Sequence, residues 1–460
     1  MTDDSTICAI STPLGHSGIG IVRLSGPEAV TIAGRFLAAT NGLSLSDQPA
    51  HRLVHGRVID EGCVVDEVLV SVMRSPHSYT TEDVVEVNCH GGIVALRKTL
   101  ELMLKAGARL AEPGEFTKRA FLNGRIDLAQ AEAVADLIGA KTTASLRAAA
   151  NQLQGKLSDR IRSLRETLAD CLAYVEATID FPEDEVPELP NPSVLATVKE
   201  IVSDIDTLLR NAEGGKLYRE GVSTVIVGKP NVGKSSILNS ILNEPRAIVT
   251  HEPGTTRDVI VESVDLRGIA LRLSDTAGIR DPGCEVERMG VERSERAIEE
   301  ADLALFVTDS SAPLSSEDRR IIERLIDKLH VIVAANKTDL KPDADLSEVA
   351  ERLPGRKIVR TSATEGIGIK ELEEAIFGEI TDGAAIAPEE ILISRLRHQV
   401  ALETARAALG FASDALEKSL SLEFVAVDLR DALDALGEIV GAVVTDDLLD
   451  RIFSEFCIGK

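Results

Sequence analysis

The chain has 460 residues, of which 44% are hydrophobic, and its 50 basic and 75 acidic side chains give a net charge of −25. A protein that wraps nucleic acid unaided is usually basic, because contacts to phosphate supply most of its affinity. The acidic balance therefore excludes that class, and any contact with RNA must come from a local patch or a partner.

The sequence predicts a cytoplasmic chain of about two to four domains. No apolar run reaches the roughly 18 residues that span a bilayer, and the start, MTDDSTICAI, lacks the basic region of a secretory signal. The six cysteines, at 8, 63, 89, 171, 284 and 457, include no C-x-x-C pair. This spacing argues against structural zinc and for free thiols in a reducing compartment.

Residues 1–119 mix short strand patterns, such as GIGIVRLSG and DVVEVNCHGG, with a helical stretch at 92–108. They predict a compact α+β domain. The period becomes helical over residues 120–217, where apolar residues from 146 to 179 alternate by three and four. That stripe predicts one long amphipathic helix.

The four prolines of DFPEDEVPELPNP, residues 180–192, are expected to end this helix. A second helix is expected at 193–213 and should stop at Gly214-Gly215. Residues 218–380 alternate strand and helix, and residues 381–460 are helical again. The simplest arrangement is an α/β domain inserted into a discontinuous all-α domain.

The segment GKPNVGKS, residues 228–235, fits the phosphate-binding pattern G-x-x-x-x-G-K-[ST] between a strand and a helix. Its glycines let backbone N–H groups surround phosphates, and the helix N-terminus adds its positive dipole. Lys234 is predicted to contact the β- and γ-phosphates. Ser235 is predicted to bind Mg²⁺.

Two later segments predict guanine recognition. NKTD (336–339) follows an apolar strand, and its Asp339 can accept hydrogen bonds from the guanine N1–H and 2-amino groups, which adenine cannot supply. SAT (362–364) would offer backbone contacts to guanine O6. The fold class we expect is therefore multidomain, with an inserted α/β P-loop GTPase of the Ras-like kind. The full predicted GTP-binding set is Asn231, Val232, Gly233, Lys234, Ser235, Ser236, Thr250, Thr255, Thr256, Asp275, Thr276, Ala277, Gly278, Asn336, Lys337, Asp339, Ser362, Ala363 and Thr364.

The segment DTAGIR, 275–280, lacks the glutamine that orients the attacking water in many GTPases and has Ile279 instead. Thr256, in TTRD, should bind Mg²⁺. Asn231 can offer its side-chain carbonyl to K⁺, which would supply the charge that an arginine otherwise provides. Glu287 is a candidate for orienting water, with Glu285 and Glu292 equally eligible from residue type. Arg257 and Arg280 are candidate arginine fingers by proximity only.

Two stretches, PGEFTKRAFLNGRIDLAQAEAVADLI (113–138) and the terminal FCIGK, together with the inserted GTPase domain, resemble the MnmE (TrmE) family of tRNA-modification GTPases. The resemblance covers essentially the whole chain. It implies a homodimer that acts on tRNA with a flavoprotein partner, MnmG (GidA). It also implies addition of an aminomethyl or carboxymethylaminomethyl group to C5 of the wobble uridine, with the carbon taken from 5-formyl- or methylene-tetrahydrofolate.

The resemblance assigns K⁺ to Asn231, Thr250, the backbone of Glu252, and Thr255, and it matches Glu287 to the water-orienting glutamate. The family's loop usually reads Asp-Ile-Ala-Gly-Thr-Thr, whereas this chain has HEPGTT at 251–256. Coordination through the backbone survives that change, but the proline stiffens the loop.

The resemblance also assigns folate binding to Arg23, Glu82, Arg125 and Lys460, with Arg125 standing where the family commonly has lysine. It suggests a role for Cys457 in the modification chemistry.

Two other functions share some of these sequence features. A GTPase that docks on ribosomal RNA, as Era-type proteins do, would need a basic RNA-binding module with a G-x-x-G loop. Residues 381–460 show no such loop and contain the acidic run DLRDALDALGEIVGAVVTDDLLD. A structural dimer with a vestigial GTPase is disfavoured because the motif series is intact.

Overall fold

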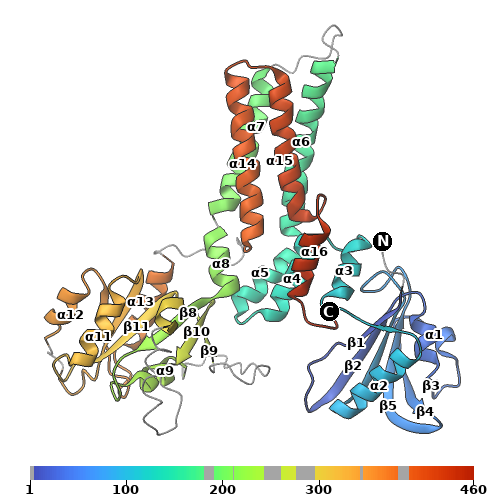
Figure 1. Ribbon diagram of the computed structural model, residues 1–460, viewed down its shortest axis with the longest axis horizontal. Helices are drawn as coiled ribbons and strands as arrows, with labels where there is room; N and C mark the ends of the chain where they lie inside the picture. The colour runs from blue at the N-terminus through green and yellow to red at the C-terminus, as the bar shows by residue number, and fades with distance from the viewer. Residues whose placement is uncertain are drawn as a thin grey trace. The chain divides into compact units, whose positions relative to one another are not determined.

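A computed structural model describes residues 5–180, 191–210, 212–242, 261–275, 296–341, 345–381 and 393–460 (Figure 1). The chain divides into two compact units, each of which joins segments that are far apart in sequence. Unit 1 contains Met1–Ala135, Leu153–Ala169 and Leu433–Lys460. Unit 2 contains Asp136–Gln152 and Asp170–Ala432.

A seven-stranded sheet with the order β3-β4-β5-β6-β2-β1-β7 forms the N-terminal part of unit 1. Its strands are β1 (Ile7–Ile10), β2 (Ser17–Ser25), β3 (Leu37–Ala39), β4 (Leu53–Asp60), β5 (Cys63–Met73), β6 (Val84–Gly91) and β7 (Arg109–Leu110). Successive side chains of a strand point to opposite faces, so Val68, Val70 and Val72 of β5 all enter one core. The helices α1 (Ala29–Gly34) and α2 (Ile93–Lys105) contribute to that same core, and η1 (Leu45–Asp47) lies beside α1.

A smaller core in unit 1 joins the start of α4 to the C-terminal end of the chain. Its helices are α3 (Glu115–Leu122), α4 (Leu128–Gly139) and α16 (Asp446–Ser454). Leu128 of α4 packs with Ile452 and Phe453 of α16, and Phe121 of α3 packs against them. Thr445 caps α16 by accepting a hydrogen bond from the Leu448 N–H. This core brings the residues before the C-terminus to the 113–138 stretch.

The prediction of one helix across residues 146–179 is wrong. Two helices, α5 (Thr143–Leu153) and α6 (Lys156–Asp180), are separated at Gly155, which has a φ of +89°. A glycine in this left-handed conformation ends a helix. The apolar spacing continues across the break, so periodicity alone did not reveal it. α6 ends at Asp180, where the prolines were expected to end the helix.

Unit 2 contains a six-stranded sheet with the order β13-β12-β11-β8-β10-β9. Its strands are β8 (Val222–Val227), β9 (Val261–Leu266), β10 (Ile269–Asp275), β11 (Leu303–Asp309), β12 (His330–Asn336) and β13 (Lys357–Arg360). β9 pairs antiparallel with β10, and the other pairs are parallel. In parallel sheets of this type, ligands bind outside the carboxyl ends of the strands.

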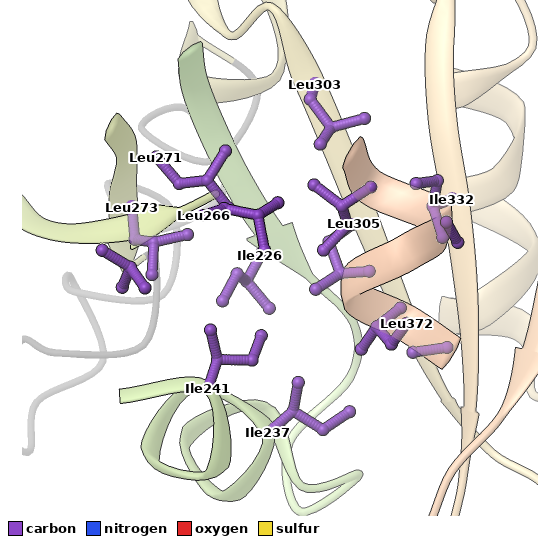
Figure 2. Close-up of a cluster of buried hydrophobic side chains, with 14 of the residues drawn as sticks. Ile226, Ile237, Ile241, Leu266, Leu271, Leu273, Leu303, Leu305, Ile332 and Leu372 are labelled. Carbon is purple, nitrogen blue, oxygen red and sulfur yellow. The ribbon is translucent and has the colours of Figure 1, made fainter. Parts of the chain in front are cut away.

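Helices cover both faces of the six-stranded sheet. One core holds α9 (Lys234–Leu242) and α13 (Ile369–Ile380) against residues such as Leu303 and Leu305 of β11, as Figure 2 shows. The opposite core holds α11 (Ser316–Leu325) and α12 (Ser347–Arg352) against Ala304 and Phe306 of the same strand. Burial on both faces explains why the strands are almost continuously apolar.

The remaining helices of unit 2 include α7 (Asn191–Arg210), α8 (Ala212–Glu220), α14 (Leu396–Glu417) and the first half of α15 (Leu422–Val440). α7 and α14 lie side by side (Figure 1). The expectation that Gly214-Gly215 ends a helix is wrong, because both residues lie buried inside α8. A glycine inside a helix costs about 1 kcal/mol, which is small compared with the free energy that packing of a buried helix contributes.

The predicted fold class is confirmed: an α+β N-terminal part, helices drawn from two separate stretches, and an α/β sheet inserted between them. Among the helices that the structure describes, none is long and apolar enough to cross a membrane.

Candidate nucleotide and N-terminal sites

The loop GKPNVGKS joins β8 to α9 at the carboxyl end of β8. Gly228 and Gly233 have φ values of +154° and +100°, which L side chains rarely adopt. A Cβ on Gly233 would lie 2.2 Å from Asn336 Nδ2, and a Cβ on Gly228 would lie 2.2 Å from the Val307 carbonyl oxygen. Both glycines of the motif are therefore required by backbone conformation and by close approach.

Lysines fix the loop from two directions. Lys234 Nζ donates to the carbonyl oxygens of Gly228 (2.6 Å) and Lys229 (2.9 Å), so its ammonium lies within the loop. Lys229 Nζ lies 2.9 Å from Oδ2 of the fully buried Asp318, which ties the loop to α11. Sequence reasoning missed Asp318 because its partner is 89 residues away.

Asn336 joins three loops of the nucleotide site. Its Nδ2 donates to the Val232 carbonyl at 2.8 Å. Its Oδ1 accepts from the Ala363 N–H at 3.1 Å and from Thr361 Oγ1 at 3.3 Å. The phosphate loop, the NKTD segment and the SAT segment are therefore fixed to one another by one buried amide.

The residues predicted to read guanine lie at the carboxyl ends of β12 and β13. Asp339 is exposed. The carbonyl of Thr361, next to the SAT segment, accepts from both N and Oγ1 of Thr338, which draws the two loops together. Ser362 closes its own loop through two backbone hydrogen bonds with Ile367.

Lys337 has a φ of +63°, and its Nζ donates to Asp309 Oδ2 at 2.8 Å. Burial alone would raise the pKa of Asp309, but hydrogen bonds from Lys337 and Ser311 outweigh it and hold that pKa below its ordinary value. The carboxylate that holds Lys337 is therefore charged at neutral pH.

Several predicted residues lie outside the described residues. They are Thr250, Glu252, Thr255, Thr256, Thr276, Ala277, Gly278 and Glu287, together with the alternatives Glu285, Glu292, Arg257 and Arg280. Asp275 ends β10, with its backbone paired to Ile226 of β8. Asn231 is exposed in the phosphate loop with a φ of +66°, and Ser235 and Ser236 are exposed at the start of α9.

The described part of the site fits a nucleotide phosphate chain. Gly228 and Gly233 give the loop a backbone conformation that leaves no room for a Cβ against Val307 and Asn336. α9 begins at Lys234, so its positive dipole end meets the loop. Asp339 supplies an exposed carboxylate acceptor for a base.

Three predicted residues of unit 1 meet around the segment 79–82. Arg23 pairs with Glu86 at 2.8 Å, and its guanidinium carbon lies 5.7 Å from the centroid of the Tyr79 ring. Arg125 donates to the Tyr79 carbonyl at 2.9 Å and lies 4.8 Å from the same ring. Glu82 accepts a hydrogen bond of 2.6 Å from Ser25 Oγ.

A cavity of about 550 Å³ opens beside Arg125 and Tyr79 and is also lined by His51, His77 and Asn123. Arg23, Glu82 and Lys460 are not among its lining residues, so the predicted set extends beyond this cavity. A larger cavity of about 790 Å³ lies along β13 in unit 2 and contains no residue of the predicted site.

The C-terminal tail lies against the 113–138 stretch. Ile458 forms an antiparallel bridge with Pro113, and the Gly114 N–H donates to the Cys457 carbonyl. Arg23 Nη1 donates to the Gly459 carbonyl at 3.3 Å. The half-buried Lys460 is therefore next in sequence to a carbonyl that Arg23 holds.

Cys457 is exposed on this tail. Cys8 and Cys89, the buried cysteines of the same unit, have thiol pKa values that burial raises to about 12 and about 11. Because the thiolate is the nucleophile, these two buried thiols are poor candidates for covalent chemistry.

Comparison with known proteins decides the family. The family model of the MnmE helical domain matches residues 128–457, and the model of the GTP-binding protein TrmE N-terminus matches residues 6–125. The chain belongs to the MnmE family. The tRNA modification GTPase MnmE of Alkaliphilus oremlandii is 49% identical over 459 residues, covering 99% of both chains.

Other MnmE proteins match over the same extent. The tRNA modification GTPase MnmE of Bacillus subtilis is 49% identical over 458 residues, covering 99% of this chain and 100% of the relative. That of Geobacillus kaustophilus is 50% identical over 464 residues, covering 100% of both. The matched length includes both the nucleotide site and the C-terminal tail.

Proposed function

We propose that this chain is the GTP-hydrolysing component of a tRNA wobble-uridine modification system. The observation that carries the proposal is the joining of the phosphate loop, NKTD and SAT segments through Asn336, in a chain that matches MnmE proteins end to end. GTP would be held by the loop of residues 228–235 through its phosphates and by Asp339 through its guanine.

Metal ions would complete this site. Ser235 and Thr256 would hold Mg²⁺, and Asn231, Thr250, the backbone of Glu252, and Thr255 would hold K⁺. Asn231 supports this assignment because it is exposed within the phosphate loop. K⁺ would supply positive charge beside the transferring phosphoryl group. Glu287 would orient the attacking water, a role that Ile279 cannot perform.

The N-terminal part would bind a tetrahydrofolate derivative as carbon donor. Its donor set suits such a ligand, because Arg23, Arg125 and Lys460 are cations for a glutamate tail and Glu82 is an acceptor for the N–H groups of a pterin. Arg23, Glu82 and Arg125 meet around residues 79–82, which supports a common site. Cys457, exposed on the tail beside them, would act in the modification chemistry.

The proposed domain division is an N-terminal domain at 1–119, helical halves at 120–217 and 381–460, and a GTPase domain at 218–380. The partners would be a second copy of the chain through the N-terminal domain, the flavoprotein MnmG, and tRNA. Because the chain is strongly acidic, the flavoprotein would supply much of the surface that attracts tRNA phosphates. The complex would act in the cytoplasm.

Potassium is expected to stimulate GTP hydrolysis by at least about tenfold over sodium, because one catalytic charge is worth several kcal/mol. Glu287→Ala should abolish the stimulated rate. The measurement is phosphate release by the purified chain in matched K⁺ and Na⁺ buffers. Glu285→Ala and Glu292→Ala are the controls and should retain the stimulation. Equal rates in K⁺ and Na⁺ would reject the K⁺ assignment and turn attention to Arg257, Arg280 or the partner.

A further inference from the structure

Arg119 lies on α3 and holds the carboxylate of Glu82. Its side chain is 9% exposed, and Nη1 lies 3.1 Å and 3.2 Å from the two carboxylate oxygens. On its other side, Nη2 donates to Glu115 Oε1 at 3.0 Å and to the Ser5 carbonyl at 2.9 Å. The guanidinium is therefore anchored independently of Glu82, so it presents a fixed donor to that carboxylate.

Positively and negatively charged side chains alternate around Arg119. Arg109 Nη2 lies 2.6 Å from Glu115 Oε1, and Glu115 also accepts from the Glu112 N–H at 2.9 Å. Burial alone would raise the pKa of Glu115, but hydrogen bonds from Arg109, Glu112 and Arg119 outweigh it and lower that pKa. The positive charges of Arg109 and Arg119 thus balance the negative charges of Glu82 and Glu115, as charges removed from water require.

Helix α3 and its C-cap residue, Asn123, also contact the segment 79–82. Thr117 Oγ1 lies 3.0 Å from the Tyr79 hydroxyl, and Asn123 Nδ2 donates to the Thr80 carbonyl at 2.7 Å. These contacts set the position of the backbone. A glutamate side chain on a fixed backbone can still rotate about its terminal torsion, for which the preferences are broad. The contacts of Arg119 with both oxygens remove that freedom.

We propose that Arg119 is a positioning residue that orients the Glu82 carboxylate toward the ligand of the N-terminal site. The inference rests on the proposed folate-binding function. A carboxylate has about four acceptor positions, of which Arg119 takes two and Ser25 one. The orientation that Arg119 imposes leaves acceptor capacity for an N–H group of the ligand.

The test measures binding of 5-formyl-tetrahydrofolate to the full chain by calorimetry. Arg119→Gln should weaken binding by about 10- to 100-fold. This is the effect of losing one to two hydrogen bonds between the ligand and the misoriented, charged Glu82 carboxylate. Arg119→Lys keeps the charge but reaches one oxygen at a time, so its affinity for the folate should lie between those of the wild type and Arg119→Gln. Glu115→Gln is the matched control, because it removes a charge from the same ion network without touching Glu82. It keeps a side-chain oxygen that can accept the hydrogen bond from Arg119. It should change affinity by less than about threefold.

A second readout separates positioning from a merely structural role. Wild-type protein should prefer the folate over its 2-deamino analogue, and Arg119→Gln should lose that preference as Glu82→Gln does. Glu115→Gln should keep it, even where its unfolding midpoint falls as far as that of Arg119→Gln. If Arg119→Gln does not fold, Arg119→Lys carries both readouts.

The outcomes are distinguishable. If wild-type protein binds the folate and discriminates through Glu82, but the Arg119 variants bind and discriminate like wild type, the positioning role is overturned and the folate site stands. Equal losses in Arg119→Gln and Glu115→Gln, with discrimination kept in both, would also overturn it. If wild-type protein does not bind the folate, the proposed folate function fails, and the role of Arg119 fails with it.

Discussion

Asp339→Asn is expected to weaken GTP binding by about 100-fold or more and to create affinity for XTP. Asp339 is exposed after β12, and Asn336 fixes the backbone on its N-terminal side. Its carboxylate would accept two hydrogen bonds from guanine, each contributing about 1.5–3 kcal/mol to a charged acceptor. An amide there instead offers a donor, which matches the second carbonyl of xanthine and opposes the 2-amino group of guanine.

The affinities of both nucleotides are measured by titration of fluorescent analogues. Asp327→Asn is the control, because it removes another exposed carboxylate of the same unit just after α11. It should bind GTP like wild type and ignore XTP. Unchanged preference for GTP in Asp339→Asn would show that guanine is read elsewhere.

Gly233→Ala should abolish GTP binding and lower the free energy of unfolding of unit 2. The added Cβ would lie 2.2 Å from Asn336 Nδ2, and the backbone φ of +100° is strained for any L side chain. The left-handed backbone alone costs about 1–2 kcal/mol. Moving Asn336 adds about 1–3 kcal/mol for each buried group left without a hydrogen bond. We therefore expect a loss of about 2–5 kcal/mol.

The control is Gly355→Ala, at a φ of +75° where a Cβ meets no heavy atom within 4 Å. It carries the backbone strain without the contact, so it should lose about 1–2 kcal/mol and keep GTP binding. Denaturant unfolding and nucleotide titration check both variants. If Gly233→Ala and Gly355→Ala lost similar amounts of stability and GTP binding, the close approach of Gly233 to Asn336 would have no separate effect.

Local pattern was sufficient for the inserted GTPase domain. The strand before GKPNVGKS and the helix after it are consecutive, and burial on both faces makes the strands recognisable as apolar runs. Pattern failed at glycines. Gly155 separates two helices although the apolar spacing continues across it, whereas Gly214 and Gly215 lie within the helix α8. Glycine can stand at the end of a helix or inside one, and tertiary packing determines which of the two forms.

The candidate site of the N-terminal part depends on contacts between residues that lie far apart in the sequence. Arg23 and Gly459 are 436 residues apart, and Arg119 and Glu82 are 37 apart. Arg119 stands inside the stretch that carries the family resemblance, but its residue type alone gives no reason to prefer it over Lys118. Only the fold shows that Arg119 is buried against Glu82 while Lys118 pairs with Asp450.

The central claim, a GTP-dependent role in wobble-uridine modification, is tested most directly by nucleoside analysis of tRNA. The strains compared are a deletion strain, the same strain carrying the wild-type chain, and one carrying Asp339→Asn. We predict that the C5-modified wobble uridine disappears on deletion, returns with wild type and stays absent with Asp339→Asn. Normal modification in the deletion strain, or full restoration by Asp339→Asn, would contradict the account.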